Sequence, residues 1–187
     1  GVAYFASINA TDFELRYVEW QDGVVSAPQV IDTVQRVSAL SVAFQANGEP
    51  AVAYLGGGSD QSIYWFQSDA VVAYRAAGGG WSRSPVATRG SDTQCGNPVS
   101  DRGFLVGLNP ALVFDGTTAY VAWLDAHDGQ FPQQDWGGSD LELGHGGPTS
   151  WTRQCVAPGG DDKGAHGGHI SLVMAGKKVG IVYDRVP

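Results

Sequence analysis

Short runs of β-branched and aromatic residues, separated by turn residues, make up most of this 187-residue chain. Long windows with apolar residues at positions i, i+3, i+4 and i+7, which amphipathic helices need, are absent. Instead, Val, Ala, Tyr, Phe and Trp occur in short runs that stop at Gly, Asp, Asn or Ser. This pattern predicts an all-β protein with many turns.

One hairpin pattern recurs along the chain: an apolar run, a tight turn, and a second run that ends near an aromatic residue. Its copies are "LSVAFQANGEPAVAYL", "PALVFDGTTAYVAWLD" and "ISLVMAGKKVGIVYD". Tyr54, Trp123 and Tyr183 take the same position in the three copies, and Tyr4 takes it in the opening "GVAYF". Such self-similarity indicates a repeat architecture.

A second hairpin pattern is also present in three copies. It begins with Ser or Thr before Asp, and reads "TDFELRYVEWQDGVVS", "SDAVVAYRAAGGGWS" and "SDLELGHGGPTSWT". Val25, Trp81 and Trp151 are expected to take equivalent places after the turn. Two hairpins per unit predict a four-stranded antiparallel meander.

Together, the two patterns resemble the repeats of secreted bacterial β-propellers of the sialidase-like (BNR/Asp-box) type. Of the Asp-box turn, Gly78 and Trp81 keep the Gly-x-x-Trp spacing, whereas the Ser and Asp that precede it are not kept. The resemblance implies a β-propeller built from four-stranded antiparallel blades. A β-sandwich with irregular strand spacing is the alternative fold.

The repeats divide the chain into a partial blade (1–33), a blade (34–92), an insertion loop with a blade (93–158), and a loop with a partial blade (159–187). The second strand of a blade is expected at both ends, so this chain, with about three blades' worth of strands, is not expected to close a ring alone. A second polypeptide, the remainder of the same chain, or a homo-oligomer would then complete the propeller.

The chain is acidic, with 19 Asp and Glu against 11 Lys and Arg and a net charge of −8. This balance argues against nucleic acid or an anionic membrane as a partner, and no apolar run is long enough for a membrane span. Cys95 and Cys155 are predicted to form a disulfide, which would close a loop of about 60 residues and contribute about 4 kcal/mol. Two buried free thiols are the alternative. The disulfide predicts an extracytoplasmic location.

Meander geometry places the long connections of this sequence at one end of the sheets and the tight turns at the other. The long connections include "LGGGSDQSIYWFQ", "LDAHDGQFPQQDWGG" and "PGGDDKGAHGGH". Loops of such length in a compact domain are usually functional or disordered. We therefore expect the functional face at this end.

His and carboxylate side chains gather in two of these connections. Asp125, His127 and Asp128 belong to one, and His166 belongs to another. They are candidate ligands for a divalent cation, either Ca²⁺ through the Asp oxygens or a transition metal through His. The alternative is a set of solvated turn residues.

Three residues precede the predicted innermost strands and would surround the mouth of a central channel. They are Arg36, Asn109 and His169. We expect them to contribute to a ligand site there, although a structural role in hydrogen bonding is the alternative for His169.

Aromatic and basic residues in the long connections add further ligand-binding candidates. Phe131 and Trp136 flank "PQQD" and suit stacking on a sugar ring, whereas Arg102 suits an anionic group. No nucleophile, zinc-protease or phosphate-loop motif occurs. We therefore expect a binding module, with carbohydrate as a candidate ligand. A glycan-active hydrolase or lyase, or a metal-dependent enzyme, is the alternative.

Overall fold

The structure is a computed structural model, and it describes residues 1–35, 37–57, 68–88, 95, 106–126, 139–159 and 165–186. These residues form strands joined by turns, and there is no helix among them. The all-β prediction is therefore confirmed. No helix in the described ranges is long and apolar enough to cross a membrane.

Four antiparallel sheets follow one another along the chain. Sheet 1 consists of β1 (Val2–Ser7), β2 (Phe13–Val18) and β5 (Gln29–Val34). Sheet 2 consists of β6 (Leu40–Phe44), β7 (Pro50–Gly57), β8 (Ser68–Arg75) and β9 (Trp81–Ala87). Sheet 3 consists of β10 (Val106–Asp115), β11 (Thr118–Asp125), β12 (Asp140–Gly147) and β13 (Ser150–Ala157). Sheet 4 is the pair β14 (Ala165–Ala175) and β15 (Lys178–Val186).

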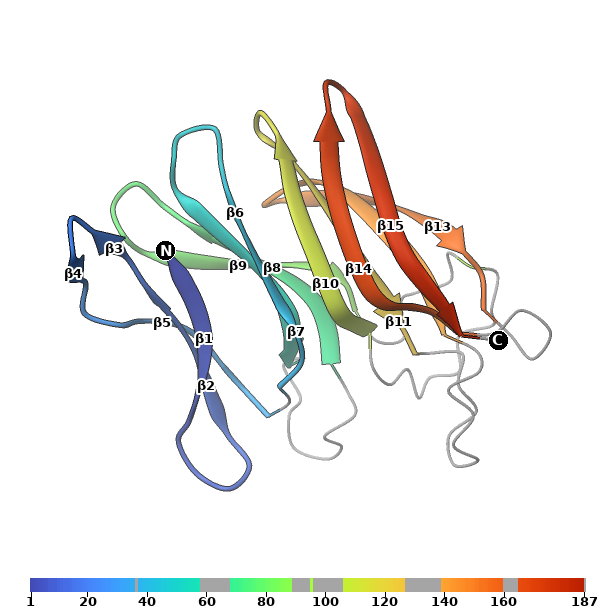
Figure 1. Cartoon of the computed structure of the whole chain (residues 1–187). Coiled ribbons are helices and arrows are strands. Elements are labelled where there is room, and N and C mark those ends of the chain that lie inside the picture. The colour runs from blue at the N-terminus through green and yellow to red at the C-terminus, as the bar shows by residue number, and fades with distance from the viewer. Residues whose placement is uncertain are drawn as a thin grey trace.

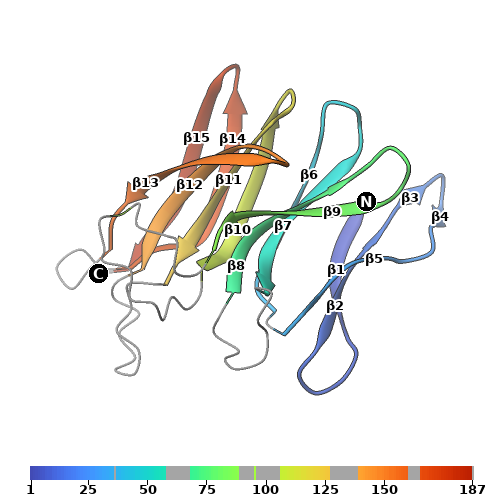
Figure 2. The ribbon, with the colours of Figure 1, turned by 180° about the vertical axis from the view of Figure 1, so that it is seen from behind.

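The sheets are arranged in sequence order, from sheet 1 at one end of the molecule to sheet 4 at the other (Figure 1). In Figure 1 the first strands β6, β10 and β14 lie nearest the viewer, and β10 contacts both of the others. Figure 2 shows the opposite side, where the last strands β9 and β13 are in front. The described sheets do not close into a ring, and they differ from the two packed sheets of a β-sandwich.

Tight turns join the first two strands of sheets 3 and 4, as the sequence predicts. Asp115 pairs with Thr118, and Ala175 pairs with Lys178, so each turn has two central residues. The first of these is Gly116 in sheet 3, with φ of 59°, and Gly176 in sheet 4, with φ of 61°. A type II′ turn requires a positive φ at this position, and glycine adopts it without steric cost.

The core of the protein lies between successive sheets. Sheet 2 contributes small side chains to this interface, among them Ala51 and Ala53. Val121 and Trp123 of sheet 3 pack in the same cluster. All four are buried, and Trp123 has no solvent exposure. Because side chains alternate between the two faces of a strand, the same strand β7 sends Tyr54 to the other interface, against sheet 1.

Tyr54 is fully buried and its polar end is satisfied across the interface. The Tyr54 hydroxyl donates a hydrogen bond of 2.7 Å to the Asp32 carboxylate on β5. Arg83 on β9 forms a salt bridge of 3.1 Å with the same carboxylate. Burial, followed by the neighbouring Asp32 charge, raises the pKa of Tyr54, so the phenol stays protonated and keeps donating.

Two tryptophans join the last strands of neighbouring sheets. The Trp81 indole N–H on β9 donates 3.0 Å to the Gln29 side chain on β5. The Trp151 indole N–H on β13 donates 2.9 Å to the Ser84 hydroxyl on β9. The sequence repeat thus places a tryptophan where sheet 2 contacts sheet 1, and another where sheet 3 contacts sheet 2, at their outer strands.

Val25, which the sequence aligns with these tryptophans, differs from them in its surroundings. It lies in a short ribbon, where β3 (Trp20–Gln21) pairs with β4 (Val24–Val25). Its side chain is 60% exposed, and no sheet precedes sheet 1 in the described residues to cover it. The Asp22-Gly23 turn closes this ribbon, which extends the β2–β5 hairpin, since the Ser26 backbone N–H donates 2.8 Å to the Glu19 carbonyl.

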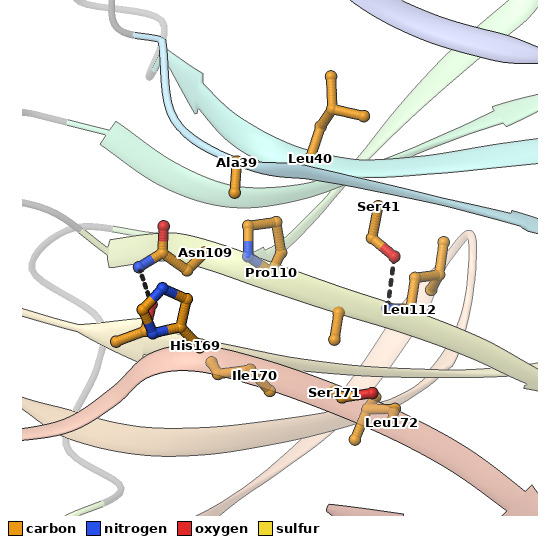
Figure 3. A pocket seen from close by; sticks show the side chains of 12 residues that line it. Ala39, Leu40, Ser41, Asn109, Pro110, Leu112, His169, Ile170, Ser171 and Leu172 are labelled. Atoms are coloured by element: carbon orange, nitrogen blue, oxygen red, sulfur yellow. Dashed lines mark hydrogen bonds between the residues drawn. The ribbon is translucent and has the colours of Figure 1, made fainter. Parts of the chain in front are cut away.

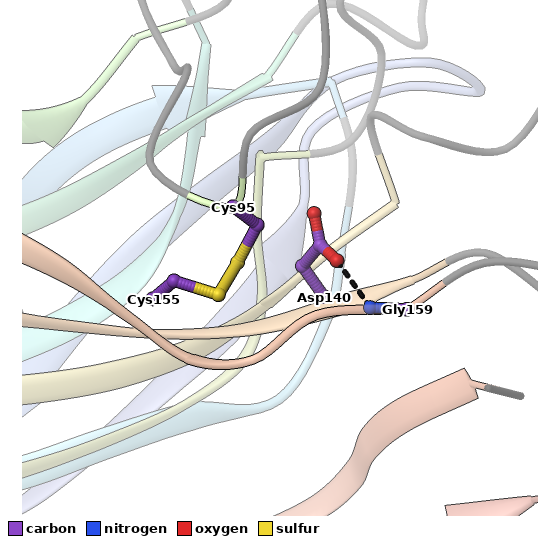
Figure 4. The surroundings of a disulfide bond; sticks show 4 residues. All are labelled: Cys95, Asp140, Cys155 and Gly159. Carbon is purple, nitrogen blue, oxygen red and sulfur yellow. Dashed lines mark hydrogen bonds between the residues drawn. A yellow bond between two sulfur atoms is a disulfide. The ribbon is translucent and has the colours of Figure 1, made fainter.

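Cys95 and Cys155 form the predicted disulfide, with their Cα atoms 4.9 Å apart (Figure 4). Cys155 belongs to β13, whereas Cys95 lies between sheets 2 and 3 in the sequence. Nearby, the Asp140 carboxylate at the start of β12 accepts a hydrogen bond from the Gly159 backbone N–H. Both interactions hold the chain close to the same end of sheet 3.

We predict that Trp81→Phe lowers the free energy of unfolding by about 1–2 kcal/mol, because the hydrogen bond to Gln29 and part of the packing are lost. Urea unfolding followed by circular dichroism measures the change. Trp20→Phe is the matched control: Trp20 is 66% exposed, and its replacement should cost about 0.5 kcal/mol or less. Equal losses in the two variants would contradict the role of Trp81.

Reduction of the disulfide is predicted to lower the free energy of unfolding by up to about 4 kcal/mol, because the bond closes a loop with a sequence separation of 60 residues. Urea unfolding with and without reductant measures this loss. A Cys95→Ser/Cys155→Ser variant should match the reduced protein and be insensitive to reductant. A double variant as stable as the oxidised protein would refute the prediction.

Candidate functional site

An open cavity of about 590 Å³ lies between the first strands of sheets 2, 3 and 4. We call it the inner cavity, and it is lined by residues 39–41, 109–112 and 168–172 (Figure 3). Three segments that are distant in sequence therefore meet at one place. Ala39, Asn109 and His169, which occupy equivalent repeat positions, all belong to its lining.

A bulge at the start of β10 places Asn109 at the cavity. The pairing register of β10 with β11 shifts on both sides of Leu108, and Asn109 has a φ of +49°. Gly107 has a φ of +103°, and a Cβ on it would lie 2.6 Å from the Cα of Ala70. Glycine is therefore required at residue 107, both by the backbone conformation and by the close approach of β8.

Strand β14 has a corresponding bulge before His169. Its register shifts between His166 and Ile170, and Gly167 has a φ of +88°. Gly167 and His169 have the same spacing as Gly107 and Asn109. The spacing Gly-x-Asn/His is a sequence signal that marks both bulges, although only the Asn and His positions were recognised from the sequence alone.

Asn109 joins the two bulges directly. Its side-chain amide donates a hydrogen bond of 2.7 Å to the Gly168 carbonyl on β14. On the other side, the Asn109 backbone N–H lies 3.4 Å from the Ser38 hydroxyl, just before β6. Asn109 therefore connects the first strands of three sheets, and its amide N–H group is already used in holding them.

His169 is a polar group of the inner cavity that is open to solvent, with 95% of its side chain accessible. Its Nδ1 lies 2.9 Å from the Asp184 carboxylate on β15, and its backbone N–H donates 2.8 Å to the other oxygen of that carboxylate. When Nδ1 carries a proton and donates it to Asp184, Nε2 presents a lone pair to the solvent in the cavity.

The two hydrogen bonds from His169 lower the pKa of Asp184. The side-chain hydrogen bond is the larger cause and the backbone hydrogen bond is the second. Gly168 leaves room for this carboxylate, because a Cβ on Gly168 would lie 3.0 Å from an Asp184 oxygen. The lining of the inner cavity thus includes the imidazole of His169 and the hydroxyl of Ser171, and Asp184 holds the imidazole from outside the lining.

The structure brings together two of the predicted ligand-binding residues, Asn109 and His169. The remaining predicted ligand-binding residues lie outside the described residues, and they are Arg36, Arg102, Phe131 and Trp136. Asp184 was not predicted from the sequence. The signal that could have found it is the hairpin register, because residues that flank a two-residue turn symmetrically are paired in an antiparallel hairpin.

Of the four predicted metal ligands, two lie among the described residues and two lie outside them. Asp125 at the end of β11 and His166 at the start of β14 are both buried, with 2% and 7% exposure. The His166 backbone N–H donates 3.0 Å to the Ser139 carbonyl, and its ring meets Tyr183 edge to face. His127 and Asp128 lie outside the described residues. Among those that are described, no three His, Cys, Asp or Glu side chains form a group that could hold a metal.

A second, smaller cavity of about 360 Å³ lies along the last strands of sheets 2 and 3. Its lining includes Trp151 and Ser84, whose side chains are hydrogen-bonded to each other. It also includes Arg83, whose side chain forms the salt bridge with Asp32. These polar groups are engaged in sheet-to-sheet contacts. The inner cavity is the stronger candidate site because its imidazole is exposed and oriented.

Comparisons of the chain with models of protein families, with curated proteins and with solved structures found no match. The functional argument therefore depends on the geometry of the inner cavity itself.

We predict that His169→Ala raises the pKa of Asp184 toward its ordinary value of 3.8, because the imidazole hydrogen bond is lost while the backbone one remains. A folded pKa below the unfolded one means that this pair stabilises the protein above the unfolded pKa. The stabilisation is lost as the pH falls through the folded pKa. NMR titration of the Asp184 carboxyl carbon measures the shift.

The control for this titration is His145→Ala, because His145 stacks on Tyr120 on another sheet and does not contact Asp184. The Asp184 pKa should be unchanged in this variant. An unchanged pKa in His169→Ala as well would contradict the assigned cause.

Proposed function

We propose that this chain is part of a β-propeller that serves as a binding module, with its ligand in the inner cavity at the end of the long connections. The observation that carries the proposal is the meeting of three first strands at one cavity, with an exposed His169 oriented by Asp184. In a propeller, first strands surround the axis, and that is where such a cavity would lie.

Three features support the propeller arrangement. Successive antiparallel sheets repeat the same strand order, and each packs on the next through one face. The first strands contact one another in sequence order. The bulges at Gly107 and Gly167 recur at equivalent positions, as expected when neighbouring sheets are related by a repeated rotation.

The chemistry of the inner cavity supports a polar, uncharged ligand of the carbohydrate class. The Nε2 atom of His169 can accept hydrogen bonds from hydroxyl groups, and Ser171 can accept or donate them. The volume of about 590 Å³ is in the range of small-molecule sites. The disulfide supports an extracytoplasmic location, where such ligands are abundant.

A second candidate function follows from the His169–Asp184 pair. A histidine held by a carboxylate through Nδ1 is an arrangement suited to acid–base catalysis, because the imidazole is fixed in one orientation and tautomer. A glycan-active hydrolase or lyase with His169 as its acid or base is therefore the alternative to a binding module.

The test is a glycan array probed with the purified chain, followed by calorimetry with the glycans that bind. We expect His169→Ala to weaken binding by about tenfold or more, because an oriented hydrogen-bonding group is lost. Ser171→Trp should weaken binding, because the larger side chain takes up part of the inner cavity and removes the Ser171 hydroxyl. His145→Ala, which changes a histidine outside the cavity, should bind as the unmodified chain does.

The same glycans distinguish the two functions. A binding module leaves a bound glycan intact, whereas an enzyme releases products that mass spectrometry detects. If product forms and His169→Asn stops its formation while the glycan still binds, the enzymatic function replaces the binding module. If no glycan binds, or if His169→Ala and Ser171→Trp bind normally, the carbohydrate site is refuted.

A further inference from the structure

Two N–H groups of the inner cavity are bonded within the protein. The Asn109 side-chain amide donates 2.7 Å to the Gly168 carbonyl, and the Leu112 backbone N–H donates 3.0 Å to the Ser41 hydroxyl (Figure 3). Proteins bind anions mainly through such N–H donors and through cationic side chains. An anionic ligand would therefore have to compete with bonds that hold the first strands together.

His169 supplies the titratable side chain among the described lining residues, 39–41, 109–112 and 168–172. Its Nδ1 lies 2.9 Å from the Asp184 carboxylate, and when Nδ1 carries the proton the imidazole is neutral. The pair is then negatively charged as a whole, and a ligand in the inner cavity meets the lone pair of Nε2. Such a surface attracts a positively charged hydrogen-bond donor and repels an anion.

The charged side chains described on the strands around β14 are mainly carboxylates. Asp125 on β11 and both Asp140 and Glu142 on β12 are buried, and these strands contact β14. Arg185 follows Asp184 on β15, so the alternation of a strand turns its side chain to the opposite face. The net charge of −8 acts in the same direction, because it attracts cations to the protein.

We propose that the inner cavity selects sugars by charge, binding an amino sugar in its ammonium form more tightly than a neutral sugar and excluding an acidic one. The ammonium group donates a hydrogen bond to Nε2 of His169, and the Asp184 carboxylate behind the imidazole stabilises the positive charge. Asp184 is thus a positioning residue that determines specificity through His169. This inference rests on the carbohydrate site of the proposed function and adds the class of sugar that the site prefers.

Protonation of His169 reverses this preference. In acid the imidazole takes a second proton on Nε2, which becomes an N–H donor, and the pair with Asp184 changes from negative to neutral. The hydrogen bonds from His169 lower the pKa of Asp184, so its carboxylate stays ionised while the imidazole gains this proton. An ammonium group then meets a donor in place of an acceptor, and the amino sugar is released.

The test is an NMR titration of the purified chain with the methyl glycosides of glucosamine, glucose and glucuronic acid, which differ chiefly in charge. At about pH 7.5 and low salt, the affinities should fall in that order, because His169 is then an acceptor. The amino sugar should bind about three- to tenfold more tightly than the neutral one, because the two charges lie several ångströms apart close to water. This advantage should shrink in about 0.5 M salt and disappear at about pH 5.

Asp184→Asn tests the origin of the selectivity. It removes the charge and leaves a single acceptor oxygen, so Nδ1–H is no longer fixed and the preference for the amino sugar should disappear. Asp115→Asn is the matched control: it removes an equal charge from an exposed position outside the cavity lining and should keep the preference. The NMR signals of the His169 ring nitrogens should show Nδ1–H in the unmodified chain and a mixture of tautomers in Asp184→Asn. Circular dichroism confirms that each variant is folded.

Several results would overturn the inference. Equal affinities for the three sugars would refute selection by charge and leave the carbohydrate site standing, whereas a preference that persists in Asp184→Asn would refute the role of Asp184. If no sugar binds, the carbohydrate site fails, and the His169 signals are titrated with ethanolamine, ethylene glycol and glycolate. A response to ethanolamine alone would support selection by charge without a sugar ring, and an equal or absent response would refute it.

Discussion

Tyr54 and Trp123 are large side chains without solvent exposure, and each fills the space between its own sheet and the preceding one. Opposite Trp123, the surface of sheet 2 is made of small residues such as Ala51 and Ala53, which let the aromatic ring approach the backbone. The packing of one apolar face of each sheet on the next sheet is what stacks the sheets in order. It is also the main source of buried apolar area in a protein without helices in its described part.

The same packing creates the candidate site. Stacking through the faces brings the first strands β6, β10 and β14 next to one another, and their edges enclose the inner cavity. The bulges at Gly107 and Gly167 interrupt the pairing with their neighbours, and they turn Asn109 and His169 toward the cavity. One of these side chains holds the strands together, and the other stays exposed beside Asp184.

Local signals predicted the hairpins well, because a tight turn with glycine determines which residues face each other across a strand pair. Pattern alone did not predict the surroundings of Val25, which is exposed where no described sheet precedes sheet 1. Asp184 was also missed, although the regular pairing of β14 with β15, in which Ile170 faces Tyr183, continues to His169 and Asp184. The local signal for this contact was therefore the two-residue turn of the same hairpin.

The sequence by itself determined the all-β class, the repeated hairpins, the alternation of residues between two faces, and the pairing of its two cysteines. These depend on short-range periodicity and on turn conformation, or, for the cysteines, on there being a single pair that can form. Only the tertiary structure decided which faces meet and where bulges place Asn109 and His169. These features depend on contacts between residues far apart in the chain, and neither periodicity nor composition specifies the geometry of such contacts.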